Sequence, residues 1–331
     1  MRSKSVPGWL LILLALPALT CQTITGTQRA GGETASAGGG QSQFPTPPPT
    51  ASIAFVATGW SVPEADREIF VMNPDGSGIT DISNSPDRDE DPSWSFDGRK
   101  IAFLSRRDGN YEVYVMNPDG SDQTRVTNTP EDEHYPSWSP DGTQIVFSRL
   151  IDAHNDLYTI NVDGTGLRQL TDTPKVSEVY PDWSPDGKLI VFSSFGGDDS
   201  GIHAIRPDGS HEKLVMGGPL HSPQWSKDGK MIAFDGEPAG CKFEVYTMKA
   251  DGSKMREITE HPMDCGGYDK HPSWSPDCDQ LIFWSSNRDA AHTEDENLFL
   301  IDADGSGETQ LTHTNNVLNY GGYDPDWSPV P

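Results

Sequence analysis

The chain has 331 residues, with 50 acidic and 24 basic side chains, so its formal net charge at pH 7 is -26. A negative charge of this size argues against direct binding of a nucleic-acid backbone or an anionic membrane surface. Glycine (33) and proline (27) are frequent and hydrophobic residues make up only 34%, a composition that favours many short strands and turns. After residue 20 no apolar run approaches the roughly 20 residues that cross a bilayer, so membrane contact is expected only through a lipid anchor.

Residues 1–21 predict a targeting segment. Arg2 and Lys4 form a short basic region, residues 9–19 are apolar, and Cys21 follows them. This arrangement resembles a bacterial lipoprotein signal, in which the cysteine becomes acylated. Leu19 lies one position later than the usual pattern has its leucine, so lipidation of Cys21 is weighed against plain secretion. Both alternatives predict an extracytoplasmic protein, either anchored to the membrane in the periplasm or at the cell surface, or secreted.

Residues 22–50 predict a disordered linker. They are rich in Gly, Ser, Thr, Gln and Pro, and they end in a proline-rich run at 45–49. With almost no apolar side chains, such a segment cannot bury enough surface to fold. It would hold a folded region, residues 51–331, away from the membrane.

Residues 51–331 are built from an internal repeat of about 45 residues, a period typical of propeller blades. Each repeat carries a Pro-X-Trp-Ser motif, and the aromatic ring is expected to fill the space between neighbouring units. The six tryptophans are Trp94, Trp138, Trp183, Trp225, Trp274 and Trp327. An Asp-Gly turn recurs with the same period, at Asp75, Asp119, Asp163, Asp208, Asp251 and Asp304.

One repeat, residues 92–127, shows the expected strands. Four short β-prone runs are separated by Asp-Gly pairs beginning at Asp97, Asp108 and Asp119. Asp-Gly between alternating apolar residues is a strong hairpin signal, because a tight turn needs positive φ. Each repeat therefore predicts a four-stranded antiparallel sheet, and no segment after residue 50 has the apolar period of a helix.

Six four-stranded repeats predict an all-β, six-bladed β-propeller. The repeat region opens at residues 52–55, which correspond to a second strand, and closes at 325–328, which correspond to a first strand. The C-terminal strand is thus expected to complete the first blade and close the ring.

The repeat resembles the TolB-type WD-like propeller repeat. The resemblance rests on WSPDGxxIxFxS (Trp138–Ser148), YVMNPDGS (Tyr114–Ser121) and QLT (Gln169–Thr171), and it extends over all six units. It implies a periplasmic or surface propeller that serves as a docking platform, since TolB binds the peptidoglycan-associated lipoprotein at its open channel. Residues 22–50 cannot form the N-terminal α/β domain of TolB, so the resemblance is limited to the propeller.

The loops that precede the six prolines are expected to open at the mouth of the central channel. They break the repeat, and binding residues are commonly placed on such loops. As a protein-docking site, the mouth would use tyrosines as anchors and carboxylates to attract a basic peptide. The predicted partner-binding residues are Asp89, Asp91, Glu133, His134, Tyr135, Glu178, Tyr180, His221, Asp269, His271, Tyr323 and Asp324.

Two other interpretations of this mouth are weighed. The acidic groups could simply form a solvated rim of a strongly negative protein. Alternatively, four converging carboxylates could hold a Ca2+ ion through oxygen ligands, and no other cofactor is expected. The carboxylates considered for calcium are Asp89, Asp91, Asp269 and Asp324.

The sequence favours a non-enzymatic protein that binds an envelope or cell-wall-associated protein as a monomer. It contains no GxSxG, HExxH or CxxC motif. The alternative is an enzyme of carbohydrate or peptide breakdown, because His134, His221 and His271 are expected near one opening beside carboxylates.

Cys241 and Cys265 lie in two long insertions expected on the same face of the ring. In an oxidising compartment they predict a disulfide. Cys278 is expected on the opposite face, without a partner.

Overall fold

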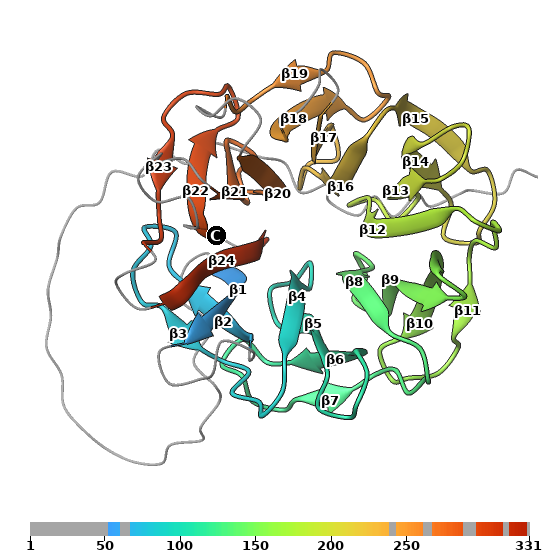
Figure 1. Ribbon diagram of the computed structural model, residues 1–331, viewed down its shortest axis with the longest axis horizontal. Helices are drawn as coiled ribbons and strands as arrows, with labels where there is room; N and C mark the ends of the chain where they lie inside the picture. Colours follow the sequence, from blue (N-terminus) through green and yellow to red (C-terminus); the bar gives the residue numbers. More distant parts are fainter. Residues whose placement is uncertain are drawn as a thin grey trace, which may run out of the picture.

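The computed structural model describes residues 52–59, 67–237, 243–260, 267–286, 296–313 and 318–329. Within these ranges six four-stranded antiparallel sheets form a closed ring, so the predicted six-bladed propeller is confirmed (Figure 1). No helix in these ranges has the length and hydropathy needed to cross a bilayer. The signal segment, Cys21 and the linker lie outside the described residues.

The innermost strand of each blade lines the channel and ends at the repeated tryptophan (Figure 1). These strands are β4 (Asp89–Trp94), β8 (Glu133–Trp138), β12 (Ser177–Trp183), β16 (Leu220–Trp225), β20 (Tyr268–Trp274) and β24 (Leu318–Trp327). The second strands are β1 (Ile53–Gly59), β5 (Ile101–Ser105), β9 (Gln144–Ile151), β13 (Ile190–Phe195), β17 (Met231–Gly236) and β21 (Gln280–Ser286).

The two outer positions of each blade complete the sheets. The third strands are β2 (Glu68–Met72), β6 (Glu112–Met116), β10 (His154–Asn161), β14 (Gly201–Ile205), β18 (Glu244–Lys249) and β22 (Glu296–Asp302). The outermost strands are β3 (Thr80–Asp81), β7 (Thr124–Arg125), β11 (Arg168–Gln169), β15 (Lys213–Gly217), β19 (Arg256–Glu257) and β23 (Thr309–Gln310).

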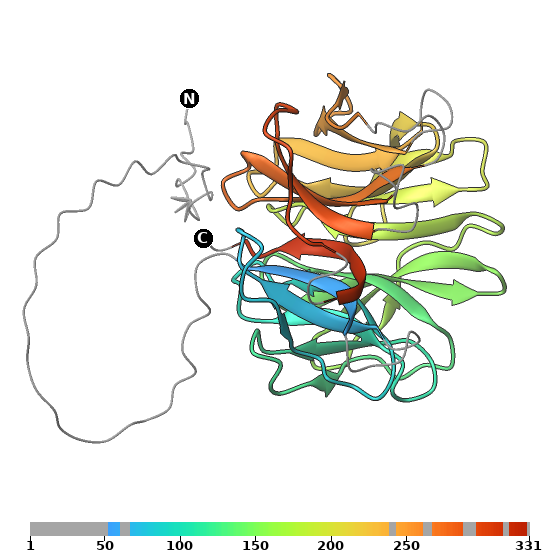
Figure 2. The ribbon, with the colours of Figure 1, turned by 60° about the vertical axis from the view of Figure 1, so that its left-hand side comes forward.

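The ring closes between the two ends of the described chain, as predicted. Strand β24 pairs antiparallel with β1, with Trp327 opposite Ile53 and Asp326 opposite Ala54. Figure 2 shows the red strand β24 beside the blue strands of the same blade. Closure completes the first blade, so each blade has one edge strand at the channel and one short edge strand on the outside.

The core lies between neighbouring blades. The six repeated tryptophans are at most 5% exposed. Trp138, for example, packs with Leu104 and Val113 of the preceding blade. Because a large aromatic side chain spans each blade boundary, the rings of tryptophan fix the spacing of the six sheets.

Candidate functional site

A β-bulge interrupts every innermost strand just before its proline. The residue preceding each proline has a φ between 46° and 55°. Left-handed backbone is unfavourable for side chains other than glycine, and such strain concentrates at functional sites. We call these six residues the mouth ring: Asp91, Tyr135, Tyr180, Ser222, His271 and Asp324.

The mouth ring lines a water-accessible cavity of about 110 Å3 at one end of the channel, together with the six prolines. The prolines add rigid apolar surface and carry no backbone N–H. Five predicted partner-binding residues are therefore brought together here, and Ser222 joins them. Those five are Asp91, Tyr135, Tyr180, His271 and Asp324.

The residues that follow the prolines form a second layer, the polar belt: Ser93, Ser137, Asp182, Gln224, Ser273 and Asp326. The side chains of Ser137, Asp182, Gln224, Ser273 and Asp326 each accept the backbone N–H of the tryptophan in the next blade. Trp225 donates its N–H to Asp182 at 2.8 Å, and Trp94 donates to Asp326 at 2.7 Å. Burial raises the pKa of Asp182 to about 6. The belt ties neighbouring blades together directly beneath the mouth cavity.

An ion pair dominates the electrostatics of the mouth ring. His271 Nδ1 lies 2.9 Å from Asp324 Oδ1, and Asp91 shares a hydrogen bond with Asp324. Burial lowers the pKa of His271, but the charge and hydrogen bond of Asp324 and the charges of Asp235 and Asp91 together outweigh burial and raise it to about 9. Burial and the negative charge of Asp324 raise the pKa of Asp91 well above its usual range. A hydrogen bond between two carboxyl groups needs a proton, and the raised pKa of Asp91 favours that proton on Asp91, beside the imidazolium–carboxylate pair of His271 and Asp324.

Two tyrosines form the opposite wall of the cavity. The ring centroids of Tyr135 and Tyr180 lie 4.0 Å apart, and Tyr180 meets the His271 ring edge-on at 5.4 Å. Burial raises the pKa of both phenols, so both stay neutral. The wall is aromatic with polar hydroxyl groups, which suits a surface that contacts a partner.

An arc of aromatic side chains borders this cavity, and of its members the sequence predicted only His221. Phe195 stacks on His221 with centroids 4.6 Å apart, and His221 lies 5.5 Å from Phe243. Phe243 meets Tyr268 edge-on at 5.6 Å, and the ammonium of Lys270 sits 4.1 Å from the Phe243 centroid. We call these five residues the aromatic arc. Phe195 ends its second strand, a position at the mouth end of every blade, which is the signal that could have found it.

Tyr323 lies at the rim rather than in the cavity lining. Arg67 stands over its ring at 5.0 Å and pairs with Glu90 at 2.9 Å, while Trp284 lies 5.7 Å away. Trp284 was not predicted either. It extends the aromatic surface from the rim to His271, with ring centroids 6.4 Å apart.

The structure does not place four of the predicted carboxylates in the mouth. They lie three residues before the proline, and the register buries them between blades at 0–1% exposure: Asp89, Glu133, Glu178 and Asp269. The four residues considered for calcium are consequently not brought together, because Asp91 meets Asp324 whereas Asp89 and Asp269 face other blades. Within the described ranges, no three His, Cys, Asp or Glu side chains gather as metal ligands would.

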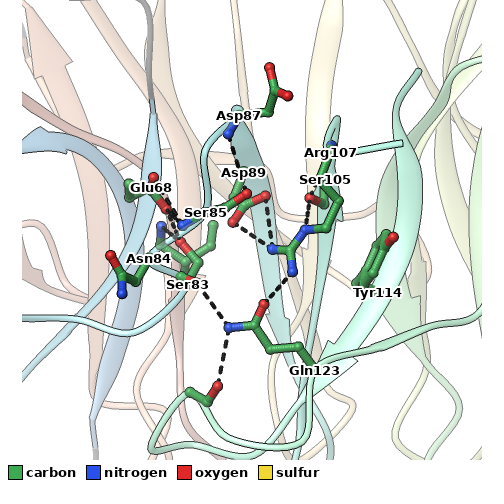
Figure 3. A network of polar contacts seen from close by, with 12 residues as sticks. Glu68, Ser83, Asn84, Ser85, Asp87, Asp89, Ser105, Arg107, Tyr114 and Gln123 are labelled. Atoms are coloured by element: carbon green, nitrogen blue, oxygen red, sulfur yellow. Dashed lines mark hydrogen bonds and ion pairs between the residues drawn. The ribbon is translucent and has the colours of Figure 1, made fainter. Parts of the chain in front are cut away.

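Figure 3 shows what Asp89 does instead. Its carboxylate accepts a hydrogen bond from Arg107 at 3.1 Å. Ser83 donates to Glu68 at 2.5 Å and accepts the backbone N–H of Ile69 at 2.8 Å. Burial raises the pKa of Glu68 to about 7 and that of Asp89 to about 6.

The same arrangement recurs at two other blade boundaries. A carboxylate near the start of the third strand lies close to the one in the next inner strand, and a threonine hydroxyl takes the place of Ser83. We call them the inter-blade pairs: Glu68 with Asp89, Glu112 with Glu133, and Asp156 with Glu178. At a further boundary Thr259 donates to the buried Glu244, and Asp269 is buried as well. Burial raises the pKa of Glu133 to about 8 and that of Glu178 to about 7. These carboxylates hold the blades together.

The three histidines considered for catalysis do not converge. His271 lines the cavity, whereas His134 lies beside Tyr111 and His221 belongs to the aromatic arc. Burial lowers the pKa of both His134 and His221, so they are neutral at pH 7.

Ser222, His271 and Asp324 occupy successive positions of the mouth ring, in the order of a serine-hydrolase triad. The Ser222 hydroxyl has no hydrogen-bond partner among the described residues, so it does not reach the imidazole. His271 is protonated at neutral pH, because its pKa is about 9. An imidazolium cannot accept the proton of a nucleophile, so these residues do not form a working general base.

Of the cysteines, Cys241 and Cys265 lie outside the described residues. Cys278 is a free, partly buried thiol in a turn between β20 and β21. Its φ is 63°, where the other blades have glycine.

Comparison with known proteins gives a family match over most of the chain. The profile described as "TolB beta propeller domain" matches residues 40–149 and 123–331. A segment of 91 residues is 35% identical to the Tol-Pal system protein TolB of Zymomonas mobilis, covering 28% of this chain and 17% of that protein. A segment of 47 residues is 40% identical to dipeptidyl-peptidase 5 of Porphyromonas gingivalis, covering 14% and 7%. The matches thus span less than a fifth of either relative.

Solved structures share the fold. TolB from Acinetobacter baumannii superposes with a TM-score of 0.69 at 20% identity, covering 84% of this chain and 66% of that one. A putative TolB from Agrobacterium tumefaciens gives 0.63 at 21% identity, covering 83% and 91%. Hydrazine synthase of Kuenenia stuttgartiensis gives 0.66 at 15% identity, covering 85% and 47%. From the family match over both halves of its ring, the chain belongs to the TolB β-propeller domain family.

Proposed function

We propose that this chain is a non-enzymatic, extracytoplasmic β-propeller that binds a protein of the cell envelope through the mouth of its channel. The observation that carries the proposal is the mouth itself: six strained residues around a cavity, bordered by an aromatic arc. Backbone strain is retained where the surrounding fold enforces it, and here it turns side chains toward solvent and a partner.

The chemistry of the mouth supports a protein partner. Interface cores are enriched in tyrosine, tryptophan and other aromatic side chains that pack at low entropic cost. Tyr268 is 41% exposed although it is held against Phe243. A large aromatic ring that is both ordered and exposed is a suitable anchor for a contact.

The extracytoplasmic location rests on the sequence of residues 1–21 and on family membership that includes a protein of the Tol-Pal system. Lipidation of Cys21, with the domain acting as a monomer on its linker, is part of this proposal. The enzymatic alternative receives less support, because His271 is not available as a base and the mouth holds no other paired nucleophile among the described residues.

Site-directed photo-cross-linking tests the proposal in intact envelopes. The full chain is expressed with a photoreactive phenylalanine analogue at Tyr268, and a matched chain carries the analogue at Leu167. Leu167 is similarly exposed at 44% but lies in the turn between β10 and β11. We expect a discrete protein adduct from position 268, absent from position 167 and lost when Tyr180→Ala is added.

The adduct must be identified by mass spectrometry, purified and shown to bind the full chain directly. Equal adducts from both positions, or none from position 268, would contradict docking at the mouth. A fluorophosphonate probe serves as the test for the alternative, since labelling that disappears in Ser222→Ala would indicate a hydrolase.

A further inference from the structure

We propose that the mouth cavity is a subsite for one protonated basic side chain of the partner, a lysine ammonium or an arginine guanidinium, which enters between Asp91 and Asp324. This inference rests on the proposed function and names the chemistry by which the partner would be recognised.

The cavity lining has more carboxyl groups than cations. Its ionisable groups are the carboxyls of Asp91, Asp182, Asp324 and Asp326, the imidazole of His271 and the two neutral tyrosines, and no lysine or arginine belongs to the lining. Asp182 and Asp326 belong to the polar belt and accept the backbone N–H groups of Trp225 and Trp94, and Asp235 accepts that of His271 at 3.1 Å. When Asp91 is ionised beside Asp324, one imidazolium and one incoming cation balance the charge of these two carboxylates.

The other charged groups around the mouth are already matched. Arg67 is paired with Glu90 at 2.9 Å. Lys270 lies over the rings of Phe243 and Tyr268 at 4.1 and 4.6 Å. Neither side chain lines the cavity, so neither supplies the missing positive charge.

An unsatisfied hydroxyl is the second, independent observation. Ser222 is 9% exposed and lines the same cavity. Its Oγ is buried and has no hydrogen-bond partner among the described residues. A buried hydroxyl without a partner is costly and rare. It could accept an N–H from an ammonium or guanidinium group placed in the cavity.

The aromatic wall fits the same ligand. Tyr135 and Tyr180 line the cavity, and both phenols are neutral. Organic cations are attracted to the faces of such rings within about 6 Å, by an amount that grows when water is excluded. The prolines of the lining would contact the aliphatic stem of a lysine or arginine side chain.

Entry of the cation is coupled to release of a proton. Before binding, Asp91 shares a hydrogen bond with Asp324, and this bond needs a proton between the two carboxyl groups. The incoming N–H groups take the place of this proton, which leaves to solvent, so the charge of the cavity is conserved. Binding should therefore weaken as the pH falls, because protons then compete for Asp91.

Calorimetric titration of the full chain with small probes tests the subsite without the partner. The probes are Nα-acetyl-lysine methylamide and Nα-acetyl-arginine methylamide, with the uncharged Nα-acetyl-norleucine methylamide as control. We expect binding in the millimolar range for at least one cationic probe at pH 7.5, with at least tenfold weaker binding of the norleucine compound. Titration in buffers of different ionisation enthalpy should reveal up to one proton released per probe bound.

Two variants connect binding to the residues. Asp91→Asn keeps an oxygen that can accept the N–H of Tyr135, as Asp91 does at 3.1 Å, but removes the charge. This variant should bind the cationic probe at least tenfold more weakly, and binding should no longer release a proton. Glu257→Gln removes one charge from the exposed outer strand β19 and should change neither quantity. Ser222→Ala should weaken binding a few-fold, and thermal unfolding of each variant checks that it is folded.

Equal binding of charged and uncharged probes, undetectable binding of both cations, or unchanged binding by Asp91→Asn would overturn the subsite. These outcomes are distinct from failure of the docking proposal. If the cationic probes bind but no protein is cross-linked, the subsite is supported and the proposal of a protein partner is contradicted. If a partner binds at the mouth with an affinity that Asp91→Asn does not change, docking is supported and the subsite is contradicted.

Discussion

Each inner strand carries polar positions that the fold treats in opposite ways, as Asp89 and Asp91 of β4 show. Asp89 is fully buried between blades and paired with Arg107, whereas Asp91 lies in the bulge and lines the mouth cavity. The two residues have the same chemistry and lie two positions apart. Their difference shows that the position relative to the bulge decides whether an acidic side chain of this strand is buried between blades or lines the cavity where we propose that a partner binds.

A second contrast lies at the boundary between β14 and β16. Where four of the other boundaries have a carboxylate, a hydroxyl and a second carboxylate, this boundary has Gly201, Met216 and Leu220. All three positions are apolar together, and Leu220 is 1% exposed. A half-complete polar network is costlier than either a full network or an apolar contact, so the three residues change as a unit.

The largest expected effect is the pH dependence of the inter-blade pairs. Folding raises the pKa of Glu68 and Glu178 to about 7 and that of Glu133 to about 8. The folded state therefore binds more protons than the unfolded state, and stability is fully present below the unfolded pKa near 4.5. It should fall by a few kcal/mol as the pH rises to 8. His271, with a pKa of about 9, adds a loss at higher pH.

Urea unfolding at pH 5.5 and 8.0, followed by tryptophan fluorescence, measures this dependence. Glu133→Gln, which cannot titrate, should flatten the slope. A midpoint that rises between these two pH values would contradict the shifts assigned to the inter-blade pairs.

The next largest effect should be a difference in unfolding free energy between removing a buried carboxylate and removing a mouth-ring carboxylate. Asp89→Ala leaves Arg107 without its partner, and losing one member of a buried pair costs about 3 kcal/mol. Asp91→Ala should cost about 2 kcal/mol or less, since it loses the hydrogen bond from the backbone N–H of Tyr135 and the one shared with Asp324, at about 1 kcal/mol each. Chemical unfolding of both variants under the same conditions gives the comparison; equal losses would mean that the layers are not functionally distinct.

A smaller effect is expected from the hydroxyls of the inter-blade pairs. Thr127 donates to Glu133 at 2.8 Å and accepts the N–H of Val113 at 2.8 Å. Thr127→Val removes both bonds at constant shape and should cost about 2 kcal/mol. Thr143→Val, in an exposed turn, is the matched control and should stay within about 0.5 kcal/mol. Similar thermal midpoints for the two variants would contradict a stabilising role of the Thr127 hydroxyl.

The smallest effect on stability should come from the aromatic arc. Tyr268→Ala truncates a ring that is 41% exposed, so the unfolding free energy should change by about 0.5 kcal/mol or less. Affinity for the partner identified by cross-linking should fall at least tenfold, as for an interface anchor. Leu167→Ala should affect neither. Unchanged affinity for Tyr268→Ala would place the contact elsewhere on the molecule.

The fold could be predicted because its signals are local. Asp-Gly turns and the period of the tryptophans mark every strand, and the incomplete ends at residues 52–55 and 325–328 indicate the closure that β24 and β1 make. These features can be recognised in the sequence without knowing which blades are neighbours.

The site could be predicted only in part. Residues directly before a proline, such as Tyr180 and His271, were correctly expected in the mouth. Glu133 and Glu178 were not separated from them, because a bulge changes the register and no residue type marks it. Phe243 reaches the arc through contacts between blades, which sequence spacing does not encode. The buried carboxylates were recognisable only as partners of the repeated Ser or Thr after the outer strand.

The bulges of the inner strands have a consequence for how binding specificity can evolve in such a protein. At all six positions the backbone follows one path, set by the bulge and the proline, while the side chains are as different as aspartate, tyrosine and histidine. Recognition can therefore drift one position at a time without a new loop having to fold. The backbone of the mouth stays the same while its side chains vary, so duplicated copies of the gene could acquire new partners through substitutions in the mouth ring alone.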